Sequence, residues 1–255
     1  MATPPVAGLP PHTIRRSARA RHARLTVTRD GELVVVLPRR APDRTAALLV
    51  AEHLDWVHAH LRRAAATRRR LDARPPLIGV RRLDVHGIPH TIRLAEDGAP
   101  GAPVPRGRAR VERLLSSDAE GLTGELVIHA GRSAATPDPV ALLDAWLRAQ
   151  AREVIEARVA ARAPAMGVTP GRISIRAQRS RWGSASPDGS LSFNWRLVLA
   201  PPYVLDVVVV HELAHLRVRG HGASFWAIAR RHAPRTDEAR VWLKAHHAEL
   251  MAALD

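Results

Sequence analysis

The sequence predicts an α+β fold in which short strands and amphipathic helices follow one another in blocks. An Asp-Gly pair at positions 30–31 stands between two β-rich runs, which is a strong hairpin signal. Apolar residues recur at helical spacing from Pro139 to Ala163, and two strand candidates at 172–176 and 191–199 precede a valine-rich helix. The chain has 255 residues, so it can bury a sizeable core in one large domain or two smaller ones.

The N-terminal part is expected to be a short disordered segment followed by a small α+β region. Residues 1–12 are rich in proline, which favours disorder. Residues 13–95 alternate between β-rich and helical patterns, so we assign them to a smaller N-terminal α+β region. The expected elements are a hairpin of Leu25–Thr28 and Leu33–Leu37, a helical segment from Pro42 to about Arg70, and a β segment from Arg82 to Leu94 with a turn at Gly87.

The remainder is expected to hold a linker with two strands and then the larger domain. Residues 96–137 begin with a stretch rich in Gly, Pro and Ala, which is typical of a linker. We assign residues 138–255 to the larger domain. The expected elements are strands at 111–115 and 126–129, a helix over 139–163 that stops before Pro164, strands at 172–176 and 191–199, a helix that begins near Pro202, and helices at 223–232 and 236–254.

The helix that begins near Pro202 carries the most informative residues of the chain. His211-Glu212-Leu213-Ala214-His215 is an H-E-x-x-H motif, and His221 follows six residues later. Residues four apart lie on the same side of an α-helix, so His211 and His215 can both bind one ion. Glu212 lies roughly 100° around the helix, where it can reach a water molecule but not the ion. Gly220 is expected to end the helix, so that His221 can approach the same ion.

Three histidine ligands that leave one position for water predict a catalytic zinc site. A chance motif is the alternative, because the chain has 14 histidines. The apolar run Val207–Val210 argues against chance, since polar side chains in a buried helix are costly unless they are satisfied. The chain has no cysteine, so zinc must bind histidine or carboxylate. We expect one Zn²⁺ ion at His211, His215 and His221, with Glu212 as the catalytic base.

The charge and the hydropathy pattern limit the partners and the compartment. The formal net charge is +15, which favours anionic partners such as nucleotides or nucleic acid, although no nucleic-acid-binding motif is present. The N-terminus lacks the pattern of a signal peptide, and no uncharged apolar run approaches the roughly 20 residues that span a bilayer. We therefore expect a cytoplasmic protein with no membrane partner.

The strand that precedes the motif helix supplies candidate residues for substrate binding. We expect this strand, which carries Phe193 to Arg196, to lie beside the metal helix as the outer strand of a small sheet and to line a cleft. An exposed sheet edge can pair with an extended peptide through main-chain hydrogen bonds. The candidate substrate-binding residues are Arg181, Asn194, Trp195 and Arg196.

Several motifs in the same order resemble the YgjP-like metallopeptidase family over about residues 13–250. The matching residues are Arg181-Trp182-Gly183-Ser184-Ala185-Ser186, Gly189, Asn194-Trp195-Arg196-Leu197, Ala200-Pro201-Pro202, Val207 to Leu216, His221 and Phe225-Trp226, and upstream Arg15 to Arg24, Asp30-Gly31, Trp56 and Val85-His86-Gly87. The resemblance implies a zincin-like, minimal gluzincin fold over 138–255, with zinc at the three histidines and Glu212 as catalytic residue. The family's loop usually has a cysteine where this chain has Ala185, which argues against a role for a thiol there.

The most direct functional prediction is a zinc metallopeptidase in which Glu212 activates water to cleave a peptide bond of a peptide or protein. A first alternative is a metal-dependent nucleoside triphosphate pyrophosphohydrolase, with phosphates bound by Arg179, Arg181 and Arg196. A second alternative is a non-catalytic zinc-bearing module that binds nucleic acid, for which Glu212 is dispensable.

Overall fold

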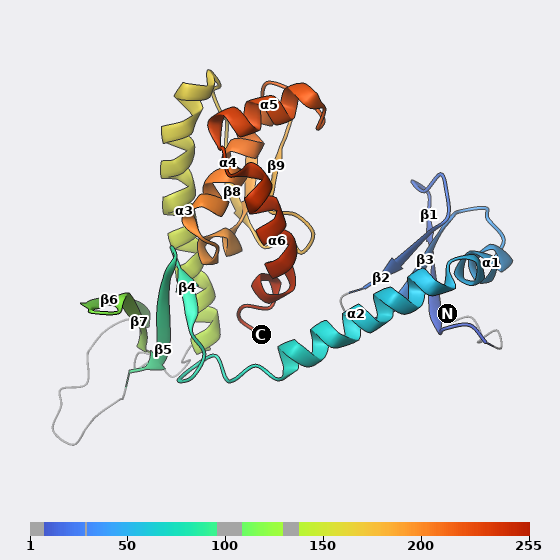
Figure 1. Cartoon of the computed structure of the whole chain (residues 1–255), viewed down its shortest axis with the longest axis horizontal. Coiled ribbons are helices and arrows are strands. Elements are labelled where there is room, and N and C mark those ends of the chain that lie inside the picture. Colours follow the sequence, from blue (N-terminus) through green and yellow to red (C-terminus); the bar gives the residue numbers. More distant parts are fainter. Residues whose placement is uncertain (1–7, 29, 96–108, 130–137) are drawn as a thin grey trace. The chain divides into compact units, whose positions relative to one another are not determined.

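The computed structural model describes residues 8–28, 30–95, 109–129 and 138–255 (Figure 1). It divides the chain into two compact units, Met1–Arg74 and Pro75–Asp255. The division lies about twenty residues before the predicted boundary at residue 95. The predicted linker at 96–108 and most of the predicted disordered segment at 1–12 lie outside the described residues.

The first unit is a three-stranded sheet with two helices. Its elements are β1 (His12–Ser17), β2 (Arg24–Val27), β3 (Leu33–Pro38), α1 (Arg44–Glu52) and α2 (Leu54–Asp72). The strands β2 and β3 form the antiparallel hairpin that the Asp-Gly pair predicts, and β1 pairs with β3 in parallel. Leu33, Val35 and Leu37 alternate toward the core, where they pack with residues of both helices such as Val50 and Val57. The predicted single helical segment is two helices, separated at His53.

The second unit begins with a four-stranded sheet. Its strands are β4 (Leu83–Val85), β5 (Ile88–Leu94), β6 (Arg110–Asp118) and β7 (Gly121–His129), in the order β4-β5-β7-β6. The side chains of Val85, Ile92, Leu126 and Ile128 are buried in the main core of this unit. Because these contacts connect the sheet to the C-terminal helices, residues 82–94 belong with the second unit and not with the N-terminal region to which they were assigned.

The longest helix, α3 (Pro139–Met166), packs lengthwise against the rest of the second unit. The Asp138 side chain accepts a hydrogen bond from the backbone N–H of Val140 at 3.2 Å and so caps the first turn. The helix does not stop before Pro164 as predicted. A proline this close to the end removes few intrahelical hydrogen bonds, and Gly167, with φ of 63°, ends the helix instead.

A second, three-stranded sheet precedes the helix with the histidine motif. Its strands are β8 (Ile173–Arg176), β9 (Gly183–Ala185) and β10 (Leu191–Asn194), in the order β8-β10-β9. The chain then forms the 3-10 helix η1 (Trp195–Leu199), in which the Asn194 side chain accepts a hydrogen bond from the backbone N–H of Arg196 at 3.1 Å. The predicted strand at 191–199 is therefore wrong beyond Asn194. The strand at the edge beside the motif helix is β9, whereas β10 lies in the centre of the sheet.

Three helices complete the second unit, namely α4 (Pro202–His215), α5 (Ala223–His232) and α6 (Thr236–Met251). The helix α4 is central, because its residues from Val207 to Val210 are all buried and it packs against α3, α5, α6 and β9. Its Asp206 forms an ion pair with Arg162 of α3, with Nη2 and a carboxylate oxygen 2.5 Å apart. This position fixes the motif at the last turn of a helix that is surrounded by protein. None of the helices among the described residues is long and apolar enough to cross a membrane.

Candidate metal centre

The three histidines of the motif meet at one point. Their Nε2 atoms lie close together, at 3.1 Å between His211 and His221 and at 3.2 Å between His215 and His221. Two ligand atoms that lie 2.0–2.1 Å from a tetrahedral zinc ion are about 3.3 Å apart. Two of the three spacings are therefore those that such an ion requires, and all three ligand atoms lie within 4.8 Å of one another, so the imidazoles can hold one metal.

The turn after α4 brings the third histidine to the other two. The helix ends at His215, one turn earlier than the predicted end at Gly220. Gly220 has φ of 78°, so it reverses the chain within this turn instead of capping the helix. The backbone carbonyl of Val218 lies 3.3 Å from Nδ1 of His215 and can accept its N–H, which leaves Nε2 as the metal-binding nitrogen.

Aromatic side chains of α5 hold the imidazole rings in place. The ring of His215 stacks on Phe225 with centroids 4.4 Å apart, and His211 meets the same ring edge-on at 4.8 Å. Burial, with the neighbouring His215, lowers the pKa of His211 to about 4. The neutral imidazole that results is the form that binds a metal ion.

Glu212 lies beside the histidines in a nearly closed space against β9. It is 5% exposed, and a Cβ atom at Gly183 would lie 2.5 Å from its Oε1. Only a glycine at position 183 therefore leaves room for the carboxylate. Desolvation by burial raises the pKa of Glu212 to about 7, and the positive charge of Arg181 offsets part of this rise.

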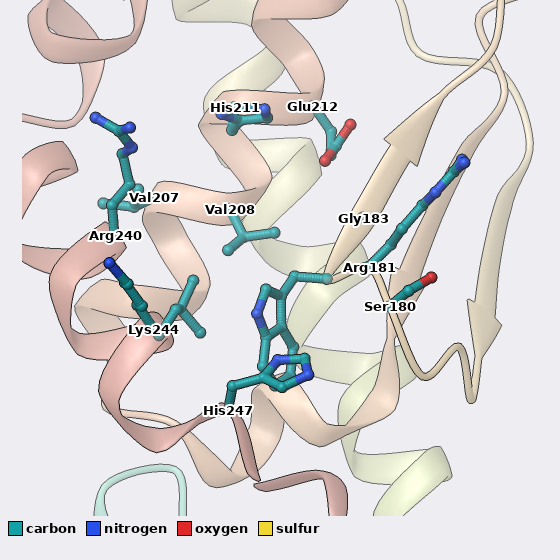
Figure 2. A pocket seen from close by; sticks show the side chains of 12 residues that line it. Ser180, Arg181, Gly183, Val207, Val208, His211, Glu212, Arg240, Lys244 and His247 are labelled. Carbon is teal, nitrogen blue, oxygen red and sulfur yellow. The ribbon is translucent and has the colours of Figure 1, made fainter. Parts of the chain in front are cut away.

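Two pockets adjoin both His211 and Glu212, one toward each end of β9. The larger has a volume of about 630 Å³ and extends from His211 and Glu212 toward α6 (Figure 2). The smaller, of about 370 Å³, extends over all three histidines and along residues 184–187. Both pockets are lined by Gly183, His211 and Glu212. The N-terminal and C-terminal sides of β9 thus face one pocket each, and a chain laid along β9 would pass through both.

The four predicted substrate-binding residues have different positions. Arg181 lines the larger pocket. Asn194 and Trp195 are fully buried, so the prediction that they line the cleft is wrong. The reason is that β10 is the central strand and the chain enters the core directly after it. The guanidinium of Arg196 lies over the Trp195 ring, 4.6 Å from its centroid, and its Nε and Nη1 atoms are buried, so this side chain is also directed into the protein.

Asn194 has a structural part in the site nonetheless. Its amide donates hydrogen bonds to the backbone carbonyls of Gln178 at 2.6 Å and Arg181 at 3.2 Å. These bonds hold the loop that leads into β9. Asn194 therefore positions Arg181 and the edge strand without facing the pocket.

Several pocket residues were not predicted. They are Gly183 of β9 and Arg240, Lys244 and His247 of α6. The positions 240, 244 and 247 follow helical spacing, so the sequence indicates that they share one face of a helix. Nothing in the sequence places that face opposite the histidine motif.

The chain is similar to a known protein family. The family model for the YgjP-like, metallopeptidase domain matches residues 21–246. The chain therefore belongs to the YgjP-like metallopeptidase family, and its α+β fold with small mixed sheets is the fold in which the site is built.

A solved structure is also similar to part of the chain. It is the crystal structure of the metallopeptidase zymogen of Pyrococcus abyssi abylysin, with 21% identity and a TM-score of 0.33. The match covers 35% of this chain and 93% of that one. No curated protein matches the chain.

Proposed function

We propose that the chain is a zinc-dependent metallopeptidase that cleaves peptide bonds with Glu212 as its general base. One observation carries the proposal: ring nitrogens of His211, His215 and His221 converge within 4.8 Å of one another beside a buried carboxylate. The family to which the chain belongs supports the same class of enzyme.

The donor set fits one zinc ion. Neutral imidazole is a preferred zinc ligand, and three protein ligands leave a fourth position for water or substrate, as in catalytic sites. The chain offers no thiolate, since it lacks cysteine. A zinc ion held by these three histidines supplies Lewis acidity, which lowers the pKa of water and polarises a carbonyl group.

Glu212 moves the proton in the proposed reaction. Its carboxylate takes a proton from the attacking water as the new C–O bond forms, and then passes that proton to the nitrogen of the leaving amine as the C–N bond breaks. The surrounding protein keeps this carboxylate in one place, because Gly183 and α4 enclose it. A fixed base needs little reorganisation during the reaction.

The edge of β9 is the proposed binding site of the substrate peptide. Among the described strands β9 pairs only with β10, so its other side is available for main-chain hydrogen bonds. An extended peptide paired there would run past His211 and Glu212, from one pocket to the other. This placement favours a peptide or protein as substrate.

No specific observation favours the two alternative functions. The arginines proposed to bind phosphates do not form one cluster, because Arg196 lies on the Trp195 ring inside the protein while Arg181 lines the pocket. A module that only binds nucleic acid does not need a buried carboxylate such as Glu212 beside its metal site.

Replacement of Glu212 by glutamine tests the proposal. Wild-type protein is incubated with an unstructured protein and, separately, with nucleoside triphosphates, and the zinc content of wild type and E212Q is measured. We expect peptide cleavage that E212Q loses while it retains zinc, whereas Glu156→Gln on the exposed face of α3 serves as a control that keeps activity. Release of pyrophosphate without peptide cleavage would contradict the proposal, as would undiminished cleavage by E212Q.

A further inference from the structure

The larger pocket beside the site is strongly basic. Arg181, Arg240 and Lys244 line it, and the only carboxylate among its lining residues is Glu212. Like charges gathered around one concavity create a positive potential that attracts anionic groups. The pocket therefore differs from a simple apolar subsite.

Two elements supply these charges from opposite walls. Arg240 and Lys244 are one turn apart on α6, and Arg181 lies on the loop before β9 (Figure 2). Figure 2 also shows Glu212 and His211 at one end of the space between the walls. A group bound between the walls is thus close to the reacting centre.

Two of the three cations have no carboxylate partner in the described part of the chain. Arg240 pairs with Asp237 at 3.2 Å and lies over the Trp226 ring, 4.4 Å from its centroid, so its charge is partly compensated. No carboxylate lies within ion-pair distance of Arg181 or Lys244 among the described residues, although Arg230 and Arg235 nearby both have such partners. Figure 2 shows the guanidinium of Arg181 directed away from Lys244, so Lys244 is the charge that a carboxylate between the walls can reach.

Apolar side chains form the rest of the pocket. They are Trp182, Val207, Val208 and Leu243. At about 630 Å³ the pocket is large enough for more than one amino-acid residue. Methylene groups can pack on the apolar part while a terminal anionic group reaches the cations, which matches a carboxylate carried on a short aliphatic stem.

We propose that this pocket binds a carboxylate of the substrate, supplied by an acidic side chain or by the C-terminus of the peptide, with Lys244 as its cationic contact. The inference rests on the proposed peptidase function and adds a substrate class to it. The enzyme then prefers peptides that carry a carboxylate at a fixed distance from the cleaved bond, on one side of it.

Chemical labelling of Lys244 tests the binding without any need for cleavage. Lys244 is the only lysine of the chain, so an amine-acetylating reagent has just this side chain and the N-terminal amine as primary-amine targets. The probes are N-acetyl-glutamate amide and N-acetyl-leucine with a free carboxylate, each compared with its neutral counterpart, N-acetyl-glutamine amide or N-acetyl-leucine amide. We expect at least one acidic probe to slow acetylation of Lys244 by about threefold or more, with the N-terminal amine as internal reference and mass spectrometry as readout. Equal rates with acidic and neutral probes would overturn the inference, and the probe that protects identifies the source of the carboxylate.

Peptide cleavage gives the second readout. The substrates are pairs of peptides that carry either Glu or Gln at one position near the cleaved bond, and a further pair with a free or an amidated C-terminus. We expect the acidic member of one pair to have a kcat/KM about tenfold higher than its neutral counterpart. Lys244→Met should abolish this preference, and Lys244→Glu should reverse it. Lys244 is exposed, so both variants should fold. Arg219→Gln removes an equal charge from the smaller pocket and should keep the preference.

The outcomes separate the inference from the function on which it rests. Cleavage of all peptides at equal rates would overturn the inference and leave the peptidase intact. Failure of the wild type to cleave any peptide would overturn the proposed function, while the acetylation experiment still decides whether the pocket binds a carboxylate.

Discussion

Gly183 of β9 lies so close to Glu212 of α4 that no side chain fits at position 183. A Cβ atom there would lie 2.5 Å from Oε1 and 2.7 Å from Cγ of the glutamate. The glycine belongs to the edge strand and the glutamate to the motif helix. Their contact therefore sets the distance between the two elements that form the site. It also buries the carboxylate on which the proposed reaction depends.

Replacement of Gly183 by alanine should displace Glu212 and lower activity. A shift of about 1 Å in a reacting group can cost about a hundredfold in rate, so we expect kcat/KM to fall by roughly ten- to a hundredfold. Zinc content should stay unchanged, because the three atoms nearest to the added methyl group all belong to Glu212. Kinetic assays and metal analysis of G183A provide the measurement.

A double-mutant cycle distinguishes this effect from a general distortion of β9. If Gly183 acts through Glu212, then G183A should cause little further loss in the E212Q background. An equal loss in both backgrounds would show that the alanine disturbs the strand itself.

Removal of the metal should lower stability as well as activity. The three imidazoles converge on one point that lies between α4, the following turn and α5, so a bound ion ties these segments together. A ligand that binds only the folded state adds about 2.7 kcal/mol when its concentration is a hundred times Kd. We expect a chelator to lower Tm by several degrees and added zinc to restore it, as followed by thermal unfolding. His215→Ala should show a much smaller response to zinc, and an equal response would contradict the three-histidine site.

The sequence predicts the histidine cluster better than the walls around it. His211 and His215 are four residues apart on one helix, so local geometry alone places them together. The end of that helix at His215 was not predicted, because Gly220 is a typical helix-ending residue and the turn at Leu216 to Arg219 depends on packing.

The cleft was predicted on the wrong strand for a related reason. Apolar residues continue from Leu191 to Leu199, and periodicity alone cannot separate a strand from a buried 3-10 turn. The order β8-β10-β9 depends on contacts between residues far apart in sequence, so neither the edge position of Gly183 nor the presence of Lys244 in the same pocket follows from local patterns. Long-range packing therefore decides which residues face the substrate.

The ion pair between Arg162 and Asp206 should contribute measurably to the stability of the site helix. Two hydrogen bonds join them, with Nε of Arg162 2.9 Å from one carboxylate oxygen, and the Asp206 side chain is only 13% exposed. We expect Arg162→Ala to cost about 1–2 kcal/mol in the free energy of unfolding, measured by urea denaturation of the full chain. The remaining carboxylate keeps a weaker partner in Arg158, 3.8 Å away, which limits the loss.

A matched variant checks the size of this effect. Arg152→Ala breaks an exposed pair with Glu156 on the same helix and should cost less than about 0.5 kcal/mol. Similar costs for Arg152→Ala and Arg162→Ala would mean that the link between α3 and α4 adds nothing beyond a surface pair.

The buried His90 should make the second unit less stable in mild acid. Its Nδ1 donates to the backbone carbonyl of Ile88 at 2.7 Å, and its Nε2 accepts a hydrogen bond from Nε of Arg113 at 2.9 Å, so the ring is neutral in the folded protein. Desolvation lowers the pKa of His90, the charges of Arg113 and His86 lower it further, and the Ile88 hydrogen bond and Asp84 oppose the shift in part. The folded state therefore binds this proton at lower pH than the unfolded chain does.

The sign of the pH dependence follows from this difference. Above about pH 6.5 His90 is unprotonated in both the folded and the unfolded state, so the neutral ring makes its full contribution to stability. Below that pH the unfolded chain binds the proton first. The free energy of unfolding then falls by at most about 1.4 kcal/mol per pH unit until the folded state is protonated too. We expect the difference in unfolding free energy between wild type and His90→Gln to shrink as the pH falls from 7.5 to 5. Urea denaturation at a series of pH values measures this difference, and a constant difference between wild type and H90Q would rule out His90 as its source.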